Sequence, residues 1–85
     1  MNLTTYIPEL SPGSAATIIG YSRVYGGYIG KLISLGLLPG TSLVILTIDP
    51  NLGNVQIMLQ ERIITLSKPE VNALIVETTE DEPNC

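Results

Sequence analysis

The sequence predicts a single mainly β domain: a small barrel of about five short strands, with one short helix inserted after the first strand. Apolar residues make up 45% of the 85 residues, and Trp, Phe and His are absent. The core is therefore aliphatic, and its many Ile and Val side chains favour strands. Short apolar segments alternate with turn-forming Gly, Pro, Asn and Asp residues, as expected for a chain that closes on itself to hide its strand edges.

The first full strand is predicted over residues 15–21, which contain the strand formers Thr17, Ile18 and Ile19. Residues 1–12 precede it and contain two prolines. We expect this segment to contact the barrel through its apolar side chains, which are Tyr6, Ile7 and Leu10.

A loop is predicted over residues 23–27, followed by the helix over residues 28–35, where apolar residues recur at the spacing of one helical face. Gly36 stands where a left-handed C-terminal cap is expected. Pro39 and Gly40 fit the two central positions of a type II turn, since proline presets φ and glycine accepts a positive φ.

The second half of the chain predicts four more strands, over residues 41–48, 54–60, 62–67 and 73–77. In the second of these, Val55, Ile57 and Leu59 alternate with residues of the opposite face, the pattern of a half-buried strand. Ser67 is expected to cap one helical turn over residues 68–72. The folded domain is predicted to span residues 1–78, and residues 79–85 to form a disordered acidic tail.

Charge argues against a nucleic-acid partner. The net charge is −4, and the positive residues are spread along the chain instead of forming a basic face. These residues are Arg23, Lys31, Arg62 and Lys68.

The residue inventory offers little to catalysis or to a cofactor. A nucleophile needs a nearby base, and the usual base, histidine, is missing. Zinc sites need Cys and His ligands, but the chain has one cysteine, Cys85, and no phosphate-binding glycine motif. We therefore expect neither an enzyme nor a resident metal or cofactor.

The start of the chain does not resemble a secretion signal, because no positive residue precedes Arg23 and the first twenty residues contain no continuous apolar segment. Apolar runs such as residues 43–46 are far too short to span a bilayer. We expect a cytoplasmic protein that reaches the inner membrane, if at all, through a partner.

Three tyrosines, Tyr21, Tyr25 and Tyr28, lie within eight residues of one another around the segment before the helix. Tyrosine provides a rigid apolar surface with a polar tip, which suits recognition. The other interpretation is that these rings close the open end of an aliphatic barrel.

The segment from Lys31 to Thr41 reads KLISLGLLPGT and combines a helical face, a glycine cap and a Pro-Gly turn. Together with residues 53–57, 64–66 and 73–77, it closely resembles the FeoA family of small cytoplasmic proteins associated with bacterial ferrous iron uptake. The positions that define this motif are Leu32, Leu35, Gly36, Leu37, Pro39 and Gly40. The resemblance implies an SH3-like barrel.

The resemblance also implies a partner, the membrane-embedded ferrous iron transporter FeoB with its cytosolic GTPase domain. The leading hypothesis is a non-enzymatic accessory protein that docks on this domain through Tyr25, Tyr28 and Lys31. Two departures from the family concern this surface. The family often has arginine where Lys31 stands, and it commonly has charged residues in the loop of residues 24–28.

Two alternatives come from other functional classes. A similar barrel forms the C-terminal domain of metal-dependent repressors, so the chain is alternatively a stand-alone metal-responsive regulator. It is also alternatively a self-associating module, in which strand edges flanking residues 41–48 pair between copies as a weak homo-oligomer.

Overall fold

The computed structural model describes residues 2–79. Its elements, in chain order, are β1 (Asn2–Tyr6), the 3-10 helix η1 (Ile7–Glu9), β2 (Ala15–Tyr21), the 3-10 helix η2 (Arg23–Tyr28), α1 (Ile29–Ser34), β3 (Ser42–Ile48), β4 (Val55–Leu59), β5 (Arg62–Leu66), α2 (Lys68–Asn72) and β6 (Leu74–Thr79). Of the predicted acidic tail, Thr79 ends β6, and residues 80–85 lie outside the described residues.

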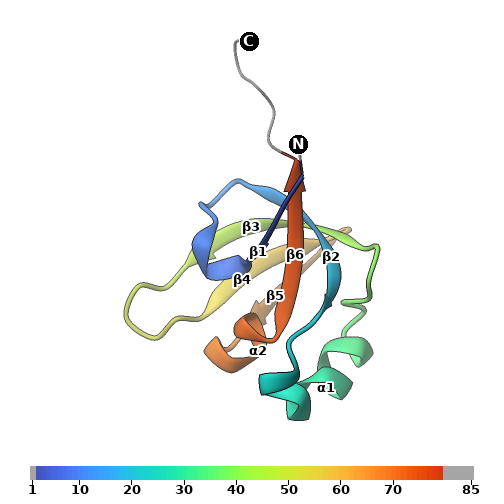
Figure 1. Cartoon of the computed structure of the whole chain (residues 1–85). Coiled ribbons are helices and arrows are strands. Elements are labelled where there is room, and N and C mark those ends of the chain that lie inside the picture. Colours follow the sequence, from blue (N-terminus) through green and yellow to red (C-terminus); the bar gives the residue numbers. More distant parts are fainter. Residues whose placement is uncertain (1, 80–85) are drawn as a thin grey trace.

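The strands form one antiparallel sheet in the order β1-β6-β2-β3-β4-β5, which curls into a small barrel (Figure 1). The mainly β prediction is confirmed, but the sheet has one strand more than expected, and α1 follows the second strand. The additional strand is β1, which runs along β6 from Asn2 opposite Thr79 to Tyr6 opposite Ile75. Pairing between strands at opposite ends of the chain leaves no pattern in the local sequence. The prediction for residues 1–12 therefore followed the two prolines, which do not favour a strand.

The sheet order shows which strand edges near residues 41–48 are paired within the chain. Strand β3 occupies this segment and pairs with β2 on one side and with β4 on the other. Pairing with β2 covers Ser42 to Val44, and pairing with β4 covers Val44 to Ile48. The two edge strands of the sheet are β1 and β5.

The core is aliphatic, as the composition predicted. In β4, Val55, Ile57 and Leu59 are buried and the residues between them are not, so the predicted alternation is confirmed. The remaining buried apolar residues come from η1, α1, α2, the strands β2, β3, β5 and β6, and two connecting segments, and are Ile7, Ala16, Ile18, Leu32, Leu37, Leu43, Ile45, Leu66, Val71, Ala73, Leu74 and Val76.

The residues between α1 and β3 adopt the two turns that the motif predicted. The amide of Leu37 donates to the carbonyl of Leu32 at 3.0 Å, which closes a Schellman cap around Gly36, whose φ is +92°. The next turn has φ +93° at Gly40 and a bond from the Thr41 amide to the Leu38 carbonyl at 3.0 Å. These turns return the chain to the sheet immediately after the helix.

One predicted loop is ordered differently. Residues 23–27 belong to η2, which is kinked at Tyr25 (φ −112°, ψ 38°) and runs directly into α1. Ser22 caps η2 by accepting a hydrogen bond from the Val24 amide at 3.3 Å. The sequence did not predict this 3-10 helix, because the segment contains two glycines and has a single capping residue, Ser22, which together make a weak helical pattern.

The two left-handed glycines provide a test of the motif. Replacing Gly40 by alanine should destabilise the domain by about 1–2 kcal/mol, because a Cβ is unfavourable at positive φ. Gly36→Ala should cost about 0.5 kcal/mol more, since its Cβ would stand 3.2 Å from the Arg62 guanidinium, which donates to the Leu35 carbonyl. Urea unfolding of both variants measures the difference. Equal losses would show that Arg62 contributes nothing to the cap.

Candidate functional site

The helical elements gather at one end of the barrel, where η2, α1 and α2 lie together in the lower part of Figure 1. An open hollow of about 420 Å³ lies in this region. Its lining comes from the end of β1, from η2 with its cap, and from the end of α2, through Tyr6, Ser22, Val24, Tyr25 and Asn72.

Ser22 fixes the position of the hollow. Its amide donates to the carbonyl of Ala73 at 2.8 Å, which joins the start of η2 to the residue that follows α2. Its hydroxyl accepts from the Val24 amide, and the residue itself is buried. The chain on either side of Ser22 is therefore held against α2, and the following residues of η2 project beside it.

The hollow has an exposed apolar border. The side chain of Val24 is 82% exposed, far more than any other large apolar residue between positions 4 and 78, and Tyr6 is 40% exposed. Apolar groups left in water at the edge of a concave surface are typical of sites that another molecule covers. The polar groups of Ser22 and Asn72 stand in the same lining.

The tyrosines divide between the two interpretations offered by the sequence. Tyr21 is structural: its hydroxyl donates to the Leu37 carbonyl at 2.6 Å, and burial raises the pKa of Tyr21. Tyr25 lines the hollow and also packs against the core. Tyr28 is 39% exposed at the N-terminus of α1 and is not part of the lining.

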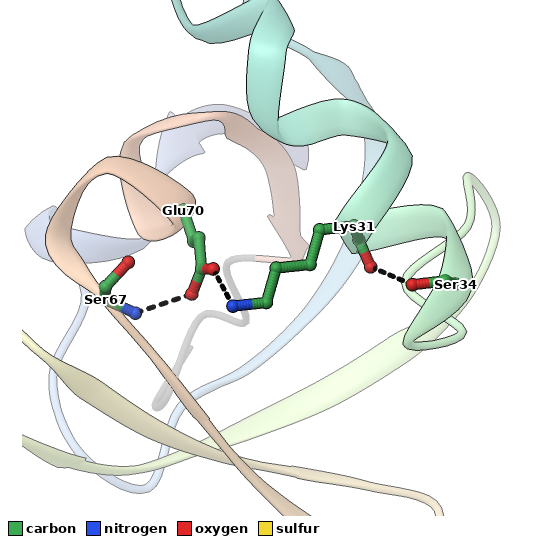
Figure 2. Close-up of polar contacts among 4 residues, drawn as sticks. All are labelled: Lys31, Ser34, Ser67 and Glu70. Atoms are coloured by element: carbon green, nitrogen blue, oxygen red, sulfur yellow. Dashed lines mark hydrogen bonds and ion pairs between the residues drawn. The ribbon is translucent and has the colours of Figure 1, made fainter.

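Lys31 is not part of the lining, and its side chain reaches Glu70 of α2. Its Nζ lies 2.5 Å from Oε2 of Glu70, while Oε1 of Glu70 accepts from the Ser67 amide at 2.8 Å (Figure 2). The Glu70 side chain is only 5% exposed, whereas that of Lys31 is 61% exposed. The predicted cap at Ser67 is part of a capping box, in which the buried Glu70 carboxylate accepts from the Ser67 amide and also pairs with Lys31 of α1.

The pKa of Glu70 reflects two opposing effects. Burial alone would raise this pKa, because it disfavours the charged form. The hydrogen bonds from Lys31 and Ser67, with the positive charge of Lys31, outweigh burial and lower the pKa of Glu70 below its usual value. The carboxylate is therefore ionised and paired at neutral pH.

Of the three residues predicted to form a partner surface, the structure brings only Tyr25 to the hollow. Sequence reasoning missed Tyr6, Val24 and Asn72, because the first belongs to the unpredicted strand β1 and the last approaches through α2. Glu70 was missed as the partner of Lys31. Its place three residues after the expected cap Ser67 is the capping-box spacing and was available in the sequence.

Within residues 2–79, no three His, Cys, Asp or Glu side chains come together as a metal site would require. In the same part of the chain, no helix has the length and apolar character needed to cross a membrane.

Comparison with known proteins gives the family. A model of the FeoA domain matches residues 5–78, nearly the whole described chain. This chain belongs to the FeoA family. The family is associated with ferrous iron transport and comprises small accessory domains that are not a known enzyme family. No curated protein sequence matches the chain.

Solved structures share the fold. A FeoA-like protein from Clostridium acetobutylicum is 22% identical, with 96% of this chain and 94% of that protein covered and a TM-score of 0.81. Iron(II) transport protein A from Clostridium thermocellum is 28% identical, with 87% of this chain and 45% of that protein covered and a TM-score of 0.71. A manganese-dependent transcriptional repressor is 15% identical, with coverage of 89% and 37% and a TM-score of 0.82. The SH3-like barrel is confirmed, and the repressor likeness concerns the fold alone.

The Glu70 carboxylate gives the domain a specific acid dependence. Because its pKa is lower in the folded protein, its stabilising effect is present above the pKa of the unfolded chain and is lost as pH falls through the folded pKa. Glu70→Gln should cost about 1–2 kcal/mol at pH 7. It should also lose less stability than the wild type below about pH 5. Urea unfolding between pH 7 and pH 3 measures both effects.

The matched control is Glu61→Gln, which makes the same charge change at an exposed turn between β4 and β5. This variant should follow the wild-type stability curve. If Glu70→Gln lost as much stability at low pH as the wild type, other carboxylates would be the cause of the acid destabilisation.

Proposed function

We propose that this protein is a non-enzymatic accessory protein of bacterial ferrous iron uptake that binds the cytosolic GTPase domain of a FeoB-type transporter. Membership of the FeoA family over residues 5–78 is the observation that carries this proposal. The residue inventory supports it, since a chain without histidine is poorly equipped for acid–base chemistry.

The hollow is the surface best suited to this partner. It offers apolar area from Val24, Tyr25 and Tyr6 beside the polar groups of Ser22 and Asn72. Aromatic and apolar residues around a concavity, with a few polar groups, are the usual composition of the centre of a protein interface. We therefore place an apolar side chain of the GTPase domain in the hollow, with Tyr28 at the border of the contact.

This surface differs from the one that the sequence predicted. We leave Lys31 out of the proposed contact, because its ammonium group pairs with Glu70. Val24 is added to the proposed contact as the most exposed apolar residue of the lining. Tyr25 stays, but its contact with the core makes an alanine substitution there a test of folding as well as of binding.

Val24→Asp separates binding from folding. The side chain is 82% exposed, so the free energy of unfolding should change by less than about 0.5 kcal/mol. The affinity for the GTPase domain should fall by about tenfold or more, since a charge would be buried in an apolar contact. Titration of isotope-labelled protein with the soluble GTPase domain, followed by amide shifts, gives the dissociation constant and the surface.

Leu52→Asp is the control, because Leu52 is 65% exposed in the β3–β4 hairpin and does not line the hollow. This variant should bind like the wild type. Amide shifts confined to the β3–β4 hairpin, or equal affinity of Val24→Asp and the wild type, would rule out the hollow as the docking surface.

A further inference from the structure

The two walls of the hollow come from different helical elements. Val24 and Tyr25 belong to η2, whereas Asn72 is the last residue of α2. The segment η2 runs directly into α1 at Tyr28, so the position of α1 constrains that of the η2 wall through the connecting residues. The width of the hollow therefore depends on what holds α1 and η2 against α2.

The segment that forms the η2 wall is weak by itself. Gly26, Gly27 and Gly30 all lie within η2 and α1, and each glycine lowers helix stability by about 1 kcal/mol relative to alanine. A side chain at any of the three would meet no atom within 4 Å, so close packing does not require glycine there. With six residues, α1 is far shorter than a helix that is stable alone. Its position must come from tertiary contacts.

Polar contacts hold this segment at both ends. At its start, the Ser22 amide bonds to the Ala73 carbonyl at 2.8 Å. Beyond the kink, the Lys31–Glu70 ion pair joins α1 to α2 and is the sole salt bridge among residues 2–79 (Figure 2). Glu70 is a fixed point, because its carboxylate is buried and its other oxygen is bound by the Ser67 amide.

We infer that the Lys31–Glu70 ion pair sets the separation of the two walls of the hollow, so that Lys31 is a positioning residue for partner binding. The inference rests on the proposed function for the identity of the partner, but not for the geometry. Lys31 acts from outside the lining, through α1 and η2, and makes no contact with the occupant. The arrangement also accounts for a lysine whose side chain is mostly exposed yet has a fixed terminal group.

Lys31→Met tests the inference, because it keeps the length of the side chain and removes the charge. The free variant should show altered amide shifts at Val24, Tyr25 and Asn72, and its dissociation constant for the GTPase domain should rise by about fivefold or more. Lys31→Arg, which restores a cation opposite Glu70, should bring both readouts back toward the wild type.

Lys68→Met is the matched control, since it removes the same charge from an exposed lysine at the start of α2, outside the lining. It should leave the three amide shifts and the affinity unchanged. Unaltered shifts at the hollow in Lys31→Met would overturn the inference. Weaker binding with unaltered shifts would overturn it too, by showing that Lys31 contacts the partner directly. If even the wild type does not bind the GTPase domain, the proposed function fails, and the shifts of the free variants still decide the positioning role.

Discussion

A single buried carboxylate organises the helical end of this barrel. Glu70 accepts a hydrogen bond from the Ser67 amide and forms an ion pair with Lys31. One carboxylate therefore both caps the start of α2 and contacts α1. Burying a carboxylate costs free energy unless an opposite charge and hydrogen bonds compensate it. Removal of Lys31 would leave this free-energy cost uncompensated. The segment η2 runs directly into α1, so this arrangement also constrains η2 at the edge of the hollow.

The scarcity of charge elsewhere has a consequence for recognition. Of the four cations in the chain, Lys31 pairs with Glu70, Arg62 donates to the Leu35 carbonyl, and the aliphatic part of Lys68 fills the space beside Gly53. Two of the four positive charges thus make contacts within the fold. The candidate docking surface instead consists of apolar and uncharged polar groups, so its affinity should depend on buried area and fit more than on electrostatic steering.

The sequence predicted most of what is local and little of what is distant. The strands β2 to β5, the cap at Gly36 and the turn at Gly40 follow from patterns within a few residues, and each was predicted. The pairing of β1 with β6 and the meeting of Tyr6, Val24 and Asn72 at one hollow depend on contacts between distant segments. Lys31 illustrates the limit: the sequence offered it as a docking residue, but the buried acid that binds it lies on another helix.

Whether Lys31 and Glu70 act together can be measured by a double-mutant cycle. Urea unfolding at pH 7 of Lys31→Met, Glu70→Gln and the double variant gives the coupling free energy between the two side chains. The arrangement of one buried and one mostly exposed group predicts a coupling of about 1 kcal/mol, with the double variant less destabilised than the sum of the single variants. Strict additivity would show that the ion pair does not hold the helical end, and that apolar packing, including that of Leu32, positions α1.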